Sequence, residues 1–205
     1  MDCGGELAGK IIPRIGVVEL TQTGEANYRK LSDISFAVIS VDNSRVKRIE
    51  DRLGSADGFM RALTLLEPSL IQRGGIAVVF GFGKVGIGCA EQIKNASMNC
   101  VVVDLSDHSL ERARKLGFES LHFVRDRQKI LDRLKESLLV LTCTGVKGVL
   151  SGFSPENIGA KTRLANMGVE DEIGEGFSLD QCLFDKKPIN FALEEPTLFE
   201  FLGKL

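Results

Sequence analysis

Histidine is scarce in this chain, and long apolar runs are missing from it. The two histidines, His108 and His122, have no neighbouring ligands in the sequence, which argues against a zinc site. No apolar run reaches about 18 residues and the start, MDCGGELAGK, is polar, so neither a membrane-spanning helix nor a signal peptide is predicted. The net charge is -2 and the basic residues are scattered, which argues against a nucleic-acid-binding surface.

The cysteines are too few and too dispersed for a disulfide framework. There are five, an odd number without close pairing: Cys3, Cys89, Cys100, Cys143 and Cys182. This usage favours a reduced, cytoplasmic setting. With 205 residues and 43% hydrophobic content, the chain is long enough for one good-sized core, or for one domain plus an appendage.

What the chain does contain is a glycine-rich turn between two apolar runs. Residues 76–80 are short, apolar and β-branched, which predicts a strand buried on both faces. A G-x-G-x-x-G pattern follows, made of Gly81, Phe82, Gly83, Lys84, Val85 and Gly86. Apolar or small residues then recur at helical spacing, and a second apolar run, residues 100–103, ends in Asp104.

Each part of this order has a physical role in binding a dinucleotide. Gly81 allows a tight turn, Gly83 lets a pyrophosphate approach the backbone, and Gly86 lets helix and strand pack closely. The free N–H groups and the helix dipole make the turn an anion site. Asp104 is placed to accept both ribose hydroxyls and would repel a 2′-phosphate, so NAD is favoured over NADP. The alternative is a domain of the same shape whose crevice is empty or regulatory.

Strand and helix patterns alternate along the rest of the chain. Strands are expected at residues 15–20, 36–41, 121–124, 138–141, 162–165 and 190–193, and helices at residues 43–53, 54–66, 108–116 and 125–136. A further helix should open at TQTGE, with Thr21 or Thr23 as its N-cap. The pattern predicts an α/β fold with a Rossmann-like, doubly wound parallel sheet. Ligands of such sheets bind at the carboxyl ends of the strands, where Gly81, Asp104, Thr142, Thr144 and Asn166 all fall.

Five motifs, in order, resemble those of the S-adenosylhomocysteine hydrolase (adenosylhomocysteinase) family. DCGGEL at residues 2–7 is similar to the family's DDGGDL, and VELTQTG at 18–24 matches SEETTTG. GFGKVGIGCA at 81–90 matches GYGDVGKGCA, TCTG at 142–145 matches TTTG, and NMGVEDEI at 166–173 resembles NIGHFDVEI. The resemblance implies that residues 1–42 are a partial substrate-domain and hinge segment, the remnant of a second domain. Residues 43–205 would then be the NAD-binding Rossmann domain.

The resemblance also implies which residues bind the cofactor. The glycine turn would hold the pyrophosphate, and Asp104 the adenosine ribose, where the family has Glu. Thr142, Cys143 and Thr144 would line the adenosine-to-ribose path; Asn166, Met167 and Gly168 would lie under the nicotinamide; Thr21 and Thr23 would reach it from the other domain. Two alternatives stay open. The threonines are equally suited to be helix caps, and Asn166 to satisfy backbone groups at a strand end.

Most of the family's acid–base residues are replaced. The family oxidises the 3′-hydroxyl of the substrate ribose with tightly held NAD, eliminates homocysteine, adds water and reduces the ketone, which needs several proton-transfer groups. Cys3, Leu20 and Val169 stand where the family has Asp, Glu and His. Its catalytic Lys and Asp fall on Val46 and Glu50 in one alignment and on Lys47 and Asp51 in another. We expect these to be surface charges, and therefore assign no catalytic residue.

Three functions follow from these observations. The first is an NAD-binding module without hydrolase activity. The second is an NAD-dependent oxidoreductase that, at full length, acts on another nucleoside or hydroxy compound. The third is an interaction domain whose crevice is filled by Phe82, Lys84 or Met167. We expect a piece of a longer protein or a domain that works with partner chains, including a homo-oligomer, but no nucleic acid, membrane or metal partner.

Overall fold

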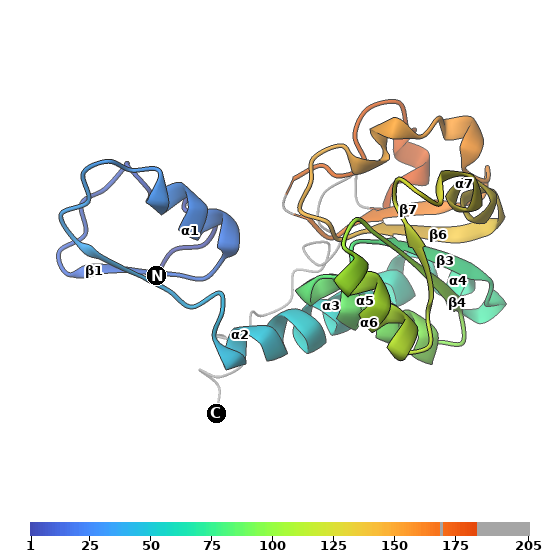
Figure 1. Cartoon of the computed structure of the whole chain (residues 1–205), viewed down its shortest axis with the longest axis horizontal. Helices are drawn as coiled ribbons and strands as arrows, with labels where there is room; N and C mark the ends of the chain where they lie inside the picture. Colours follow the sequence, from blue (N-terminus) through green and yellow to red (C-terminus); the bar gives the residue numbers. More distant parts are fainter. Residues whose placement is uncertain (169, 184–205) are drawn as a thin grey trace. The chain divides into compact units, whose positions relative to one another are not determined.

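The computed structural model describes residues 1–168 and 170–183. The chain forms two compact units, Met1–Asp51 and Arg52–Leu205 (Figure 1). The division falls after Asp51, whereas the sequence predicted a boundary after residue 42, because helix α2 (Arg45–Ile49) belongs to the first unit. Val169 and the strand expected at residues 190–193 lie outside the described residues.

The first unit is a small βαβ arrangement. Strands β1 (Gly16–Glu19) and β2 (Ala37–Ser40) pair in parallel, and helix α1 (Gln22–Arg29) connects them. Asp2 forms an isolated parallel bridge to Glu19, so the glycine-rich start of the chain is attached to β1. Thr21 is the N-cap of α1, and its hydroxyl accepts a hydrogen bond from the Gly24 amide, as the sequence predicted for a threonine here.

Three further helical segments lie between α2 and the sheet of the second unit in the sequence. A π-helical turn, Glu50–Gly54, follows α2 and runs into α3 (Ser55–Leu66). Pro68 ends α3, as predicted, since proline has no N–H to continue the helical hydrogen bonds. The same residue opens a helix that the sequence analysis missed, α4 (Pro68–Arg73), because proline is favoured in the first helical turn.

The second unit contains the predicted parallel sheet. Its strands are β3 (Ile76–Phe80), β4 (Asn99–Asp104), β5 (Glu119–His122), β6 (Ser137–Thr142) and β7 (Arg163–Asn166), in the order β5-β4-β3-β6-β7. Helices α5 (Lys84–Asn95), α6 (Asp107–Lys115) and α7 (Arg127–Glu136) connect them. The first strand of this sheet in the sequence, β3, is therefore central. The next two strands extend the sheet to one edge and the last two to the other, which confirms the Rossmann-like, doubly wound fold.

Hydrophobic cores cover both faces of this sheet. Ala77 and Val79 of β3 point to one core, which Phe59 of α3 and Ile93 of α5 complete. Val78 and Phe80 belong to the other core, together with side chains of α7. This alternation matches the two-residue period of a strand and explains why β3 has no polar face. Among the described helices, none has the length and apolar character needed to cross a membrane.

Strand β5 begins and ends two residues before the expected position. The reason is the turn that follows it, where the His122 ring nitrogen Nδ1 accepts hydrogen bonds from the amides of Val124 and Arg125, both at 3.2 Å. The carboxylate of Asp126 in turn accepts the His122 amide at 2.9 Å. These hydrogen bonds fold residues 123–126 back, so the apolar Phe123 and Val124 lie beyond the strand.

Candidate functional site

The glycine turn lies at the carboxyl end of the central strand β3. Gly81 has a φ of 91°, and a Cβ there would lie 2.6 Å from the Cys143 carbonyl oxygen, so only glycine fits. A Cβ on Gly86 would lie 2.0 Å from the Gly81 carbonyl oxygen, because α5 packs directly on the turn. These two glycines therefore have the structural roles that the sequence predicted.

Gly83 faces open space. Its φ is -78°, an ordinary value, and no heavy atom comes within 4 Å of where its Cβ would be. It is the N-cap residue of α5, and no side chain caps that helix. The first amides of α5 thus border an open volume, which is the arrangement that lets a phosphate group approach a helix N-terminus closely.

The Asp104 carboxylate lies directly beside this turn. Oδ2 accepts the Phe82 amide at 2.7 Å, and Oδ1 accepts the Ser106 amide at 2.8 Å. A carboxylate has about four acceptor positions, so each oxygen keeps capacity for another hydrogen bond. Asp104 therefore holds the turn and keeps acceptor positions for further donors, and its contact with a ribose stays a prediction.

The buried Phe82 side chain anchors the glycine turn in the core. Its side chain is fully buried and packs edge-on against Phe118, with ring centroids 5.6 Å apart. Its carbonyl accepts a hydrogen bond from Arg112, whose guanidinium also lies 5.5 Å from the Phe82 ring. Phe82 and Met167 belong to the core on the α5 side and do not fill the space in front of Gly83. Of the three side chains that the interaction-domain alternative named, Phe82 and Met167 therefore do not close the crevice, whereas its closure by Lys84 stays a prediction.

Thr142 and Asn166 are fully buried and bonded to their own surroundings. The Thr142 hydroxyl lies 3.2 Å from the Asn166 Oδ1, which also accepts the Gly168 amide at 3.0 Å. The Asn166 Nδ2 donates to the carbonyls of Gly168 and Glu170. These side chains fix the loops after β6 and β7, as one of the sequence alternatives held for Asn166. A contact between them and the cofactor stays a prediction, as it does for Thr144, Cys143 and Gly168.

Sequence reasoning missed Glu172, which closes the loop after β6. This fully buried carboxylate accepts three hydrogen bonds of 2.7 Å, from the Thr144 amide, the Thr144 hydroxyl and the Gly145 amide. Burial raises its pKa above the usual value, against the lowering effect of those three donors. The available signal was the position of Glu172 within the NMGVEDEI motif.

A second buried carboxylate, Glu19, organises the first unit. It accepts the amides of Gly4 and Gly5 at 3.1 Å, together with the amide and hydroxyl of Thr21 at 2.8 Å. Thr21 is thus both a helix cap and a partner of Glu19, whereas Thr23 is exposed. The Gly4–Gly5 part of the glycine-rich start is therefore held against this carboxylate. The contact predicted between the two threonines and the nicotinamide stays a prediction.

The expectation of surface charges is wrong for Lys47 and Asp51. The Lys47 Nζ lies 3.2 Å from the Asp51 Oδ1, and their side chains are only 17% and 12% exposed. Burial lowers the pKa of Lys47, but the hydrogen bond and charge of Glu50 and the charge of Asp51 outweigh it and raise that pKa. Val46 is 74% exposed. The alignment that places the family's Lys and Asp on Lys47 and Asp51 therefore brings the two side chains into contact.

Most of the sequence matches a known protein family. The family model of the S-adenosyl-L-homocysteine hydrolase NAD-binding domain matches residues 51–192, well over half of the chain. The chain belongs to the S-adenosyl-L-homocysteine hydrolase family. Residues 51–192 are its NAD-binding domain, and NAD is the cofactor. The open approach at Gly83, the uncapped α5 and the spare acceptor capacity of Asp104 all fit that cofactor.

Two curated relatives and one solved structure illustrate the extent of the match. S-inosyl-L-homocysteine hydrolase of Methanopyrus kandleri is 29% identical over 82% of this chain and 39% of that protein. Adenosylhomocysteinase of Triticum aestivum is 28% identical over 66% of this chain and 27% of that protein. This chain therefore spans well under half the length of these relatives. A dipicolinate synthase structure from Bacillus halodurans shares the fold, with a TM-score of 0.54, 14% identity, and coverage of 73% of this chain and 50% of that one.

Proposed function

We propose that this S-adenosylhomocysteine-hydrolase-like chain holds NAD and does not itself hydrolyse S-adenosylhomocysteine. NAD binding is supported by one observation, the position of the Asp104 carboxylate beside the open Gly83. A glycine turn next to a carboxylate can bind a pyrophosphate at the turn and a ribose at the acid. NAD, when bound, supplies a hydride acceptor. This chain's own residues hold and orient it.

The proposed lack of hydrolase activity is supported by residues of the first unit. Leu20, which follows Glu19, has no group that exchanges a proton. Partial burial and the nearby Glu19 carboxylate raise the pKa of the Cys3 thiol, so Cys3 stays protonated at neutral pH and is a poor base. The raised pKa of Lys47 likewise keeps its amine protonated.

Calorimetry with NAD and NADP tests the binding half. We expect NAD to bind more tightly than NADP, and Asp104→Ala to abolish the preference. The absence of binding for both nucleotides would contradict the proposal. A thiol assay for homocysteine, with S-adenosylhomocysteine and NAD present, tests the other half, since steady release would show that hydrolysis is retained.

A second function is supported by the buried Lys47–Asp51 pair. Two largely buried charged side chains 3.2 Å apart, with Glu50 as a further partner of Lys47, suggest a retained polar site in the first unit. One relative is named for S-inosyl-L-homocysteine, a compound with a different base, so the family includes proteins for more than one nucleoside. The second proposal is therefore an NAD-dependent oxidoreductase acting on another nucleoside or hydroxy compound at full length. Absorbance of reduced nicotinamide, followed as candidate substrates are added to the full-length protein, tests it.

The proposal includes a cytoplasmic location and assembly with further copies of the chain. The five cysteines are all free, which suits a reducing compartment. Native mass spectrometry of the purified protein reports the subunit count and any co-purified dinucleotide in one measurement. A disulfide-linked or strictly monomeric species would contradict this part of the proposal.

A further inference from the structure

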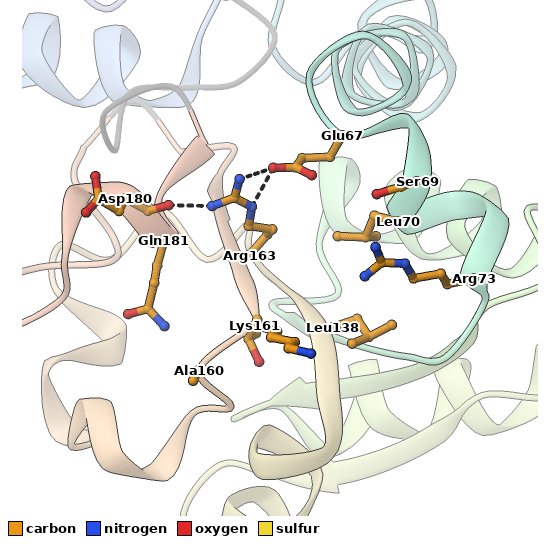
Figure 2. Close-up of a pocket in the computed structure, with 11 residues that line it drawn as sticks. Glu67, Ser69, Leu70, Arg73, Leu138, Ala160, Lys161, Arg163, Asp180 and Gln181 are labelled. Atoms are coloured by element: carbon orange, nitrogen blue, oxygen red, sulfur yellow. Dashed lines mark hydrogen bonds and ion pairs between the residues drawn. The ribbon is translucent and has the colours of Figure 1, made fainter.

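The second unit has a pocket at the amino ends of the sheet strands, whereas the glycine turn lies at their carboxyl ends. It lies where β6 and β7 begin, next to α4, and its volume is about 330 Å³ (Figure 2). Leu138 is near the start of β6, Lys161 and Thr162 precede β7, and Leu70 and Arg73 come from α4. Because the glycine turn is at the carboxyl ends of the strands, this pocket is separate from the NAD site. Its volume is in the range typical of small-molecule sites.

One cation of the pocket already has partners. The Arg163 Nε donates to Glu67 Oε1 at 2.5 Å, and its Nη2 pairs with the same oxygen. Its Nη1 donates to the carbonyl of Asp180. Glu67 thus neutralises the Arg163 guanidinium. The same guanidinium connects Glu67, the residue before α4, to the segment after β7, so this side of the pocket is held in place.

Two further cations of the pocket have no such partner. Within residues 1–168 and 170–183, Arg73 and Lys161 take part in no hydrogen bond or ion pair. Figure 2 shows both charged ends directed into the pocket, whereas the Asp180 carboxylate points away from them. Glu67 is already paired with Arg163, so the two like charges of Arg73 and Lys161 favour an anion in the hollow between them.

The pocket residues beside these cations include both apolar and polar side chains. Leu70 and Leu138 present apolar surface, and Ser69 adds a hydroxyl. We propose that this pocket binds a small organic dianion, a phosphate monoester or a dicarboxylate, with Arg73 and Lys161 as its cationic contacts. The guanidinium matches two oxygens of one anionic group, the ammonium meets the remaining charge, and the leucines contact the carbon skeleton.

Nuclear magnetic resonance titration of the full chain tests this proposal. The probes are glycerol 3-phosphate and succinate, with inorganic phosphate and glycerol as references. We expect saturable shifts of the Leu70, Leu138 and Lys161 amides with at least one of the two organic dianions, and weaker binding as salt is added. The dianion that binds more tightly identifies the anionic group that is preferred.

Matched variants separate the pocket from general surface charge. Arg73→Gln and Lys161→Gln should each weaken binding by at least about tenfold, the loss expected for one charge-assisted contact. Arg114→Gln removes another exposed arginine, on α6, and should change nothing. Glu67→Gln frees the charge of Arg163 and should tighten binding. Thermal unfolding checks that each variant is folded.

Four outcomes would overturn the proposal. They are the absence of saturable shifts with both dianions, undiminished binding by both Arg73→Gln and Lys161→Gln, shifts centred on residues 81–84, and equal affinity for inorganic phosphate. The third outcome would assign the anion to the NAD site, and the fourth would show that the organic part is not recognised. NAD binding by residues 81–104 is measured separately, and its result neither supports nor contradicts the anion pocket.

Discussion

The Phe82 amide donates a 2.7 Å hydrogen bond to the carboxylate of Asp104, which couples the glycine turn to the end of the neighbouring strand. The two features that the sequence assigns to pyrophosphate and ribose are therefore parts of one structure. A substitution at Asp104 acts on the turn as well as on the ligand, and the choice of substitution decides which effect is measured.

Asp104→Asn should reduce NAD affinity by roughly 10- to 150-fold, because hydrogen bonds to a charged group contribute about 1.5–3 kcal/mol. The Asn oxygen still accepts the Phe82 amide, so the turn should persist, while the new Nδ2 faces the Ser106 amide and should lower stability at the end of β4. The preference for NAD over NADP should fall too, because the charge that repels a 2′-phosphate is gone. Asp104→Glu, which keeps the charge, is the matched control for calorimetry. Unchanged NADP discrimination in Asp104→Asn would contradict this role.

Gly83→Ala and Gly86→Ala should separate binding from stability. A methyl group on Gly83 enters open space and should change the free energy of unfolding by about 1 kcal/mol or less, yet obstruct the pyrophosphate. A methyl group on Gly86 meets the Gly81 carbonyl and should lower stability by about 1–3 kcal/mol. Urea unfolding and NAD calorimetry on both variants measure the two effects. Normal NAD affinity in Gly83→Ala would mean that the pyrophosphate lies elsewhere.

Glu172→Gln should lower the free energy of unfolding by about 1–3 kcal/mol near neutral pH, because an amide group then faces a backbone donor of the loop after β6. The pH dependence has a defined sign. Since burial raises the folded-state pKa of Glu172, ionisation costs wild-type stability as pH rises above the ordinary value of 4.5. The gap between wild type and Glu172→Gln should therefore be largest in acid and narrow with rising pH. A gap that widens with pH would show that the three donors outweigh burial.

Tyr28 is the only tyrosine of the chain, so its ionisation can be followed alone by phenolate absorbance. Its hydroxyl donates to the Asp2 carboxylate at 2.7 Å, and burial together with this contact raises its pKa to about 12. Its stabilising contribution is present below the ordinary pKa of 10 and is lost as pH rises through 12. In Asp2→Asn the titration should move toward lower pH. A value near 10 in the wild type would show that the phenol is free in water.

The sequence predicted most of the second unit because its signals are local. The uninterrupted apolar runs of β3 and β4, the glycines between them and Asp104 lie within one stretch of about 30 residues, where order and spacing define a βαβ unit. The helix that starts at Pro68 was missed because one residue type both ends and begins helices. The placement of β5 depended on hydrogen bonds of His122 and Asp126 that periodicity does not show.

The parts of the site that sequence reasoning missed depend on contacts between distant residues. Glu172 acts on Thr144 and Gly145, which are far from it along the chain, and no local pattern distinguishes a buried carboxylate from a solvated one. Lys47 and Asp51 have helical spacing, which was visible, but their burial is set by the packing around them. The burial of the Thr142 side chain is likewise set by distant packing, and its contact with the cofactor stays a prediction.

The central position of β3 has a consequence for how the protein is made. Both strands that flank β3 follow it in the chain, the turn after it rests on the Cys143 carbonyl, and the loop containing Cys143 is closed by Glu172. During synthesis, residues 76–104 leave the exit tunnel before residues 137–172, which complete the surroundings of the turn. Loading of the dinucleotide must therefore wait until nearly the whole domain has emerged, and a nascent chain stalled before Glu172 would expose an unfinished parallel edge to chaperones.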